Sequence, residues 1–509
     1  MKEKNTSKIQ LAGVMIYFAF ITLPLLGCVI QQTGEFEFSI SERQIALIGN
    51  SLKLGISVTL IAVAMGFFCA LFINNSTFFT GWKKYYFVLL MPIPFYIYAL
   101  SWMYMIKLMA IIWPDIRGYS VSGIGACIFV ESLAYFPLAL LFILIGMENI
   151  NADELRMASI YGDDNKVVRR IVLKSILPYC TAASGLICTL SMTEFSVPSM
   201  FQYHTYALDI FSVYSRTGNA LTAYVQCLPL AVFLIVPVAW LVKNIKQFEN
   251  KTNMKDKYRL KTSGILKGLS VIAFLVSILQ IAVPVLVFIF TAGGIKSVIA
   301  EYGLIMEELN TSFWTSFWTA FLCLFIAMIP AFFLRNHLNK ITAGLILYTM
   351  AIPGTIQAMG LLKIVNMARW TSIENSIFLM AWGCALKFAP FMILWLCVAR
   401  MRVNQKEFEM AEIFETKKFE SLKVKLHLLI PGYIAGFALV FFMTFAEEGI
   451  PLILMAPGKE VITVKIYNYL HYGASEMVSA FSVIILSFIL GIEVLLVFLW
   501  KWMKGFKMR

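Results

Sequence analysis

Twelve apolar runs, each about 20 residues or longer, dominate the 509-residue chain. A helix of about 20 residues crosses the hydrocarbon core of a membrane, and in lipid only helices and closed barrels satisfy every backbone polar group. We therefore expect an all-α polytopic membrane protein with about twelve transmembrane helices. The runs occupy residues 11–30, 50–73, 86–107, 121–146, 178–197, 221–242, 264–291, 312–334, 342–362, 373–399, 431–455 and 478–500.

The charge balance points to the same class of protein. Hydrophobic residues make up 60% of the chain and charged residues 14%, whereas soluble domains are about half apolar and about a quarter charged. The net charge of +13 does not indicate nucleic-acid binding, because Lys and Arg gather on the cytoplasmic side of membrane segments. Residues 243–267 hold eight basic and two acidic residues. We expect the linker at 243–263 and both termini to be cytoplasmic, with lipid rather than nucleic acid as a partner.

One stretch of the chain occurs twice. Asn151 to Pro178 (NADELRMASIYGDDNKVVRRIVLKSILP) matches Asn404 to Pro431 (NQKEFEMAEIFETKKFESLKVKLHLLIP), and the offset is 253 residues throughout. A duplication of this length predicts two structurally equivalent halves.

The two expected halves contain six spans each. The first covers residues 1–242, with its core at 50–242, and the second covers residues 264–509, with its core at 312–500. Because six is even, both halves should face the same way, related by an axis along the membrane normal. We expect a solute pathway between them.

Each copy of the repeated stretch begins like a helix with a docking face. Asn151 and Asn404 can cap the free amides of a helix start, while Glu154 and Glu407 can reach back to the cap. The apolar residues that follow cover an arc of about 160° on each short, otherwise polar helix. They are Met157, Ala158, Ile160 and Tyr161 in the first copy and Met410, Ala411, Ile413 and Phe414 in the second. Such a face needs a partner.

This order of residues resembles the EAA loop of type-1 binding-protein-dependent ABC permeases, a cytoplasmic coupling helix that docks into a groove of an ATPase subunit. Two copies in register resemble a fused permease of the ferric iron, thiamine and polyamine group, closest to ferric iron permeases, over nearly the whole chain. The resemblance implies the type I importer permease fold and the bacterial cytoplasmic membrane. It also implies two copies of an ABC ATPase subunit, which would use ATP and Mg, and an extracytoplasmic substrate-binding protein.

The two copies differ at the turn that follows the docking face. Gly162 can adopt a left-handed conformation at no steric cost, whereas Glu415 at the equivalent place cannot. We therefore expect the first copy to hold the more standard docking geometry. The alternative for both loops is a duplicated amphipathic segment without a docking role.

No enzyme site is visible in the sequence. It lacks a GxxxxGK[ST] phosphate loop, an HExxH or GxSxG motif and cysteines at metal-ligand spacing. We expect a transport subunit that binds no cofactor or metal of its own. A secondary transporter with two parallel repeats is the alternative, and would need ionisable relays in the membrane but no docking helices. Residues 25–28 also resemble a lipoprotein cleavage site, with acylation at Cys28, which would leave the remaining topology unchanged.

A few ionisable residues lie in or next to the apolar runs, where charges are costly and often functional. Glu131 and Lys387 occupy the fourth and tenth spans, one helical turn apart in the repeat register, so they could form an ion pair that breaks during transport; each could equally be satisfied locally. Glu194, Glu447 and Glu448 lie where the fifth and eleventh spans reach the outer face. They could line an entrance for a cationic cargo, or simply begin the following loops.

The last external loop, Met455 to Glu476, resembles the segment found at this point in ferric iron permeases. Ferric iron is therefore the favoured cargo. Thiamine, polyamine and phosphonate stay open, because the stretches around Glu194 and Glu447 resemble several branches of the family.

Overall fold

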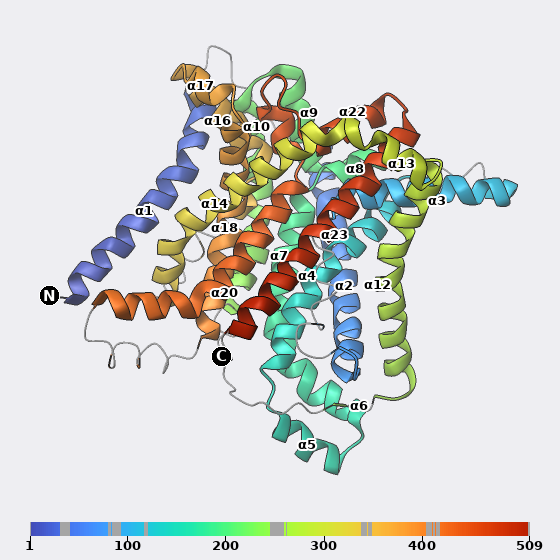
Figure 1. The fold of residues 1–509 in the computed structure, drawn as a ribbon, viewed down its shortest axis with the longest axis vertical. Helices are drawn as coiled ribbons and strands as arrows, with labels where there is room; N and C mark the ends of the chain where they lie inside the picture. The colour runs from blue at the N-terminus through green and yellow to red at the C-terminus, as the bar shows by residue number, and fades with distance from the viewer. Residues whose placement is uncertain are drawn as a thin grey trace.

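The computed structural model describes residues 2–30, 41–79, 83, 93–116, 121–244, 259–260, 262–336, 344, 349–403, 410, 413 and 418–506. No strand occurs in these ranges, and the helices form one elongated bundle (Figure 1). The first turn of α1, the last turn of α23 and helix α5 all lie in the lower half of Figure 1, while α9, α13 and α22 lie at its upper end.

The helices of the first half are α1 (Lys2–Val29), α2 (Glu42–Asn75), α3 (Phe95–Ile112), α4 (Ile124–Glu148), α5 (Ala152–Tyr161), α6 (Asp164–Val167), α7 (Leu173–Thr193), α8 (Ser196–Met200), α9 (Tyr206–Thr217), α10 (Ala220–Phe233) and α11 (Ile235–Asn244). Those of the second half are α12 (Gly264–Thr291), α13 (Ile295–Glu301), α14 (Met306–Asn336), α16 (Gly354–Met367), α17 (Thr371–Glu374), α18 (Ile377–Arg402), α20 (Lys418–Phe445), α21 (Gly449–Leu454), α22 (Ile462–His471) and α23 (Ser475–Phe506).

Ten of the described helices are long and apolar enough to cross a membrane, and α10 with α11, bent by 49°, would make an eleventh. The predicted all-α polytopic class is confirmed. The expected span at 342–362 is not among the ten, because α16 begins only at Gly354 and has 14 residues. Residues 337–343 and 345–348 lie outside the described ranges.

Two prolines set the start of equivalent helices. Pro94 is the residue before α3 and Pro353 is the residue before α16, with similar extended backbone angles, ψ 137° and 133°. A proline inside a helix removes a hydrogen bond and clashes with the preceding turn. The apolar runs predicted at 86–107 and 342–362 pass through these prolines, whereas α3 and α16 begin directly after them.

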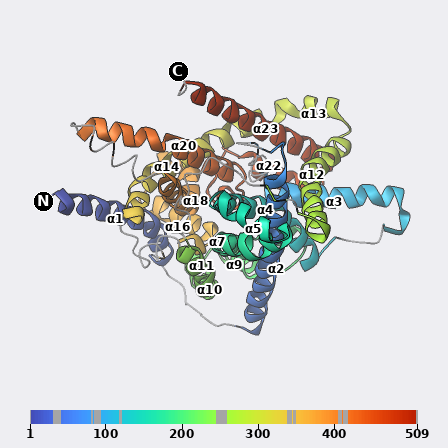
Figure 2. The ribbon, with the colours of Figure 1, turned by 90° about the horizontal axis from the view of Figure 1, so that it is seen from below.

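The first helix of each half packs against the other half. Helix α1 lies along α14 and α16, and α12 lies along α2 and α3. Figures 1 and 2 place α1 and α12 on opposite sides of the bundle. The halves are therefore interlocked, and only their cores form separate packing units. Most of the predicted linker at 243–263 lies outside the described residues, so the boundary itself stays a prediction.

The contact between α1 and α16 brings two backbones together. A Cβ added to Gly360 would lie 1.9 Å from the Pro24 carbonyl oxygen, and one added to Gly27 would lie 2.2 Å from the Gly360 carbonyl oxygen. Membrane helices commonly approach this closely at small residues. Cys28 is buried in the same contact, where its thiol lies 3.7 Å from the Ile356 carbonyl oxygen.

The start of the second half is also tied to the loop that follows α5. The Asn165 side-chain amide donates to the Ser263 carbonyl (3.2 Å) and hydroxyl (3.1 Å), and its oxygen accepts from the Ser263 amide (3.1 Å). Three hydrogen bonds thus join the first turn of α6 to the residue that precedes α12.

Substitution Gly360→Ala should destabilise the protein by about 1–3 kcal/mol, because the new methyl group meets a backbone carbonyl that cannot turn away. The midpoint of thermal unfolding of the purified protein would measure this. Gly491→Ala in α23 is the matched control, since nothing lies within 4 Å of its added Cβ, and it should leave the midpoint unchanged or raise it. Equal midpoints for the two variants would contradict the close contact of α1 and α16.

Candidate transport pathway and coupling surface

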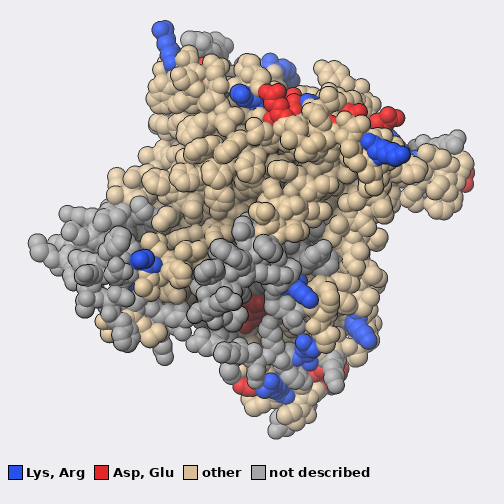
Figure 3. Space-filling model, viewed as in Figure 1, with Lys and Arg blue, Asp and Glu red and all other residues tan. Residues whose placement is uncertain are grey.

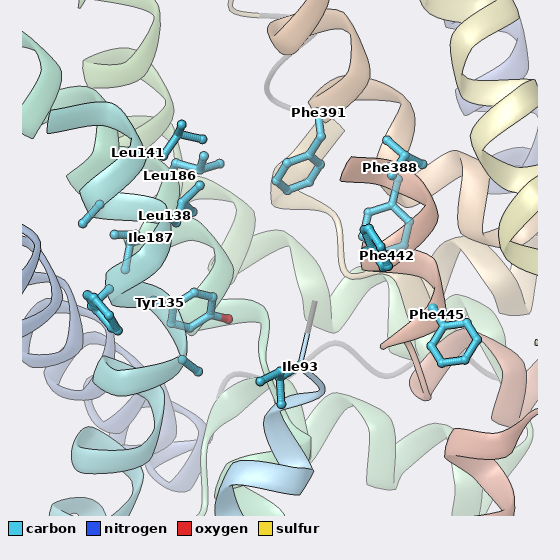
Figure 4. Close-up of a cluster of buried hydrophobic side chains, with 14 of the residues drawn as sticks. Ile93, Tyr135, Leu138, Leu141, Leu186, Ile187, Phe388, Phe391, Phe442 and Phe445 are labelled. Atoms are coloured by element: carbon cyan, nitrogen blue, oxygen red, sulfur yellow. The ribbon is translucent and has the colours of Figure 1, made fainter. Parts of the chain in front are cut away.

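A cavity of about 170 Å³ lies between the two halves. Its walls come from α4 and α7 in the first half and from α18 and α20 in the second, together with residues at the starts of α3, α8, α16 and α21. The lining is mostly apolar. Figure 4 shows Leu138 and Leu141 projecting from one side, and Phe388 and Phe391 from the other.

The cavity follows the repeat register residue by residue. The six lining residues of α4 correspond to the six of α18 at an offset of 253, from Ala134 and Lys387 at one end to Ile145 and Val398 at the other. The same offset relates the lining residues around Glu194 to those around Glu447. The duplication seen in the sequence therefore forms the two walls of one cavity.

Glu194 and Glu447 perform the same local task in the two halves. Glu194 Oε1 accepts hydrogen bonds from the amides of Phe195 (3.1 Å) and Ser196 (2.8 Å) and from the Ser196 hydroxyl (2.5 Å). Glu447 Oε1 accepts from the Ile450 amide (3.4 Å). Each carboxylate thus partners amides at the start of a short helix, α8 or α21, that have no partner within the helix.

Lys387 in α18 forms an ion pair with the equivalent carboxylate of its own half. Its Nζ lies 2.6 Å from Glu447 Oε2, and both residues line the cavity. The accessible fractions are 28% of the Lys387 side chain and 11% of the Glu447 side chain, so the pair lies at the cavity surface. The other half has no such pair, because Ala134 stands in the place of Lys387.

Glu131 and Lys387 do not pair with each other, and the alternative that each is satisfied locally agrees with the structure. Glu131 is buried in α4 and accepts a hydrogen bond from the Ser191 hydroxyl of α7, inside its own half. Position 131 lies on the side of α4 that faces α7, whereas Lys387 lies on the cavity side of α18. Each of the two side chains therefore has its partner within its own half, Glu131 in α7 and Lys387 just after the end of α20. Glu131 is not among the residues that line the cavity.

Glu448 is the second charged residue that breaks the symmetry of the cavity, since Phe195 occupies the equivalent place. It lies beyond the end of α20 and is only 7% exposed. Among the described residues its Oε2 atom has no hydrogen-bond partner. Burial, and then the nearby carboxylates of Glu194 and Glu447, raise the pKa of Glu448 to about 8. Glu448 is therefore largely protonated at neutral pH, and Glu194, Glu447 and Lys387 give the cavity its charge.

The described residues hold no group of three or more His, Cys, Asp and Glu side chains placed to bind a metal ion. A second hollow lies at the upper end of the molecule, lined by Glu307, Glu308 and Glu460. Glu308 pairs with Lys465 at 2.5 Å and Glu460 accepts a hydrogen bond from Asn468 at 2.7 Å. Figure 3 shows acidic side chains gathered at this end.

Helix α5 presents an uncovered apolar face. Met157 is 60% exposed and Ile160 is 77% exposed, whereas Leu155 on the opposite side is 6% exposed. Ala158 is half-buried between these two sides. The predicted apolar face is therefore present in the first copy, and the described residues leave most of it uncovered. Of Tyr161 only its place at the end of α5 is described.

The start and end of α5 differ in part from the prediction. Asn151 caps the helix, since its side chain accepts from the Asp153 amide at 3.0 Å, but Glu154 forms no bond that closes a capping box. Gly162 is extended, with φ −157° and ψ 164°, a conformation open to any residue. The expectation of a left-handed turn at Gly162 is wrong, and with it the reason for ranking the two copies.

Little of the second copy can be compared. Met410 and Ile413 are helical and exposed, by 48% and 74%. The other predicted docking residues of this copy lie outside the described residues: Glu407, Ala411, Phe414 and Glu415.

Sequence reasoning missed the Lys387–Glu447 pair, although a signal for it existed. Glu131 and Ser191 are 60 positions apart, and so are Lys387 and Glu447, because the same two pairs of helices, α4 with α7 and α18 with α20, pack in the same register. Equivalent helix pairs therefore predict partners within a half. The capping box at Ser41 and Gln44, which begins α2, was also missed.

No family model and no solved structure matches the chain. The chain is 20% identical, over 478 residues, to the Fe(3+)-transport system permease protein FbpB 2 of Haemophilus influenzae. The match covers 91% of this chain and 92% of that protein, so it includes both halves and both copies of the repeated stretch. The chain is a multi-pass membrane protein that resembles, along nearly its whole length, an ABC importer permease of the ferric iron type.

Proposed function

We propose that this chain is the transmembrane subunit of an ATP-driven importer for ferric iron. It forms the translocation path between its two halves and has no ATPase site of its own. The observation that carries the proposal is the full-length similarity to a ferric iron permease, which the cavity between the halves and the open face of α5 support. Thiamine, polyamine and phosphonate are alternative cargoes, and a secondary transporter is the less favoured mechanism.

Coupling to the ATPase is assigned to α5 and to the matching segment of the second half. An apolar face such as that of Met157 and Ile160, exposed at the cytoplasmic end, is stabilised when a partner covers it. Two ATPase subunits, one for each segment, would use ATP and Mg and move the segments together on closing. The residues assigned to this contact are Glu154, Met157, Ala158, Ile160, Tyr161, Gly162, Glu407, Met410, Ala411, Ile413, Phe414 and Glu415.

The charge of the cavity favours a cationic cargo. Glu194 and Glu447 oppose the single ammonium of Lys387, and carboxylates in a low-dielectric cleft concentrate cations. Glu448 can add a third carboxylate when an entering cation displaces its proton. A substrate-binding protein on the outer side would deliver the cargo and set most of the specificity. Both termini and the basic linker are assigned to the cytoplasm, and the hollow at Glu308 to the outer side.

Charged substitutions on α5 should uncouple transport from ATP hydrolysis. Ile160→Glu changes a side chain that is 77% exposed, so the spans should still fold, but a carboxylate buried unpaired in a partner groove should weaken docking about tenfold or more. Ala158→Glu should act in the same direction. Cargo-stimulated ATP hydrolysis in the assembled transporter would measure both.

Ala300→Glu in α13, at the opposite end of the molecule, is the matched control and should keep full stimulation. Wild-type stimulation in both Ile160→Glu and Ala158→Glu would remove α5 as a coupling element and favour the secondary transporter.

The orientation can be tested with single cysteines. Lys459→Cys, in the exposed loop after α21, should react in intact cells with a maleimide that cannot cross membranes, because this loop is assigned to the outer side. Asp153→Cys on α5 should react only after the cells are opened. The reverse pattern of labelling would invert the topology and remove the docking argument.

The cargo assignment is tested by gene deletion in the native host. Loss of the chain should lower uptake of radiolabelled ferric iron and raise the iron requirement for growth. Restoration by the wild-type gene is the control. Normal iron uptake together with lost thiamine or polyamine uptake would reassign the cargo to that branch.

A further inference from the structure

We propose that Lys387 is a built-in counter-ion of the cavity: its ammonium group occupies the place beside Glu447 that a cationic cargo takes in transit, and so limits how tightly the cavity binds that cargo. This inference rests on the proposed function, since it assigns a role in the passage of a cation. Lys387, which is present in the second half only, would set how tightly the cavity binds the cargo and how fast it releases it.

The geometry places a positive charge where a cargo cation would bind. The Lys387 ammonium lies 2.6 Å from Glu447 Oε2, and 28% of its side chain is accessible, so it faces the cavity and is not sealed in a helix contact. The same Nζ atom lies 5.4 Å from the centre of the Phe388 ring. An aromatic face attracts cations at this distance, so the ammonium has a second favourable contact next to the carboxylate.

The other half shows that the fold does not require this lysine. Ala134 replaces Lys387, and the carboxylate of Glu194 is satisfied by backbone amides and a serine hydroxyl without any basic partner. A lysine present only to neutralise the carboxylate would be needed on both sides. The ion pair therefore gives the wall formed by the second half a positive charge that the other wall lacks.

The Glu448 carboxyl group has an oxygen that is open to a ligand. It is 7% exposed, lines the cavity, and its Oε2 has no hydrogen-bond partner within the described part of the chain. Buried polar atoms are rarely left unpaired. A cation that enters the cavity can bind this oxygen first and reach Glu447 when the Lys387 ammonium moves away.

The ammonium should weaken cation binding and thereby speed release. Conduction requires a site that attracts the cargo but does not retain it. A fixed positive charge a few ångströms away opposes a cargo cation by Coulomb repulsion, which in a protein interior corresponds to a change in affinity of about tenfold or more. Removing the charge should tighten binding and slow turnover together.

The first test uses the full-length chain purified in detergent and Tb³⁺, a hard trivalent cation whose luminescence reports binding to carboxylate oxygens. Lys387→Met should bind Tb³⁺ about tenfold more tightly than the wild type, while Lys387→Arg, which keeps the charge, should not. Lys387→Met combined with Glu447→Gln should lose the gain. Lys296→Met, on exposed helix α13, controls for non-specific binding.

Unchanged Tb³⁺ affinity in Lys387→Met would overturn the inference. If Lys387→Met does not fold, Ala134→Lys gives an independent test, because it places an ammonium next to Glu194. This variant should bind Tb³⁺ about tenfold more weakly than the wild type. Equal Tb³⁺ affinity of the variant and the wild type would also count against the proposal. These outcomes do not depend on iron as the cargo. Normal iron uptake in the deletion strain would contradict the assignment of ferric iron as the cargo, but it would not change the conclusion from Tb³⁺ binding.

A transport measurement separates this role from a structural one. In cells, uptake of radiolabelled ferric iron by Lys387→Met should show a lower KM and a lower kcat, and Lys387→Arg should restore both. A loss of kcat with unchanged KM, not rescued by Arg, would identify Lys387 as a structural residue and overturn the inference.

Discussion

The exchange of first helices is the contact on which the rest of the architecture depends. Helix α1 reaches the second half through backbone contact at Gly27 and Gly360, and α12 packs along α2 and α3 of the first half. Between membrane helices there is little hydrophobic driving force, so close packing must hold the structure together. Each half is thereby held by a helix of the other, and the cavity lies between the two cores.

The cavity shows how a duplicated protein can acquire an asymmetric function. Its two walls match position by position, and a symmetric scaffold by itself treats both sides alike. Two substitutions add an ionisable side chain on one side only, Ala134 to Lys387 and Phe195 to Glu448 in the order of the halves. Both lie in the second half, next to Glu447, the counterpart of Glu194. The scaffold is thus conserved in shape, while its electrostatics are concentrated on one side.

Much of this organisation could be predicted from the sequence, since apolar runs of membrane length and a constant 253-residue offset depend only on local composition and order. The starts of α3 and α16 could not be predicted in this way, because Pro94 and Pro353, which precede them, lie within runs that hydropathy alone reads as continuous. The partner of Lys387 was also misjudged, because the repeat register does not show that α18 packs against α20 of its own half and places Glu447 beside Lys387. The extended backbone at Gly162 could not be predicted either, because it depends on the orientation of α6 relative to α5, and glycine allows many backbone conformations.

The link between Asn165 and Ser263 gives the molecule a mechanical connection that sequence order does not suggest. Three hydrogen bonds fasten the base of α12 to α6, immediately after α5, and the body of α12 lies along α2 and α3. Helix α12 is thus attached to the first half at both its start and its body, while its chain continues into the second half. The segment after α5 therefore contacts the start of the second half directly, although 98 residues separate Asn165 from Ser263 in the sequence.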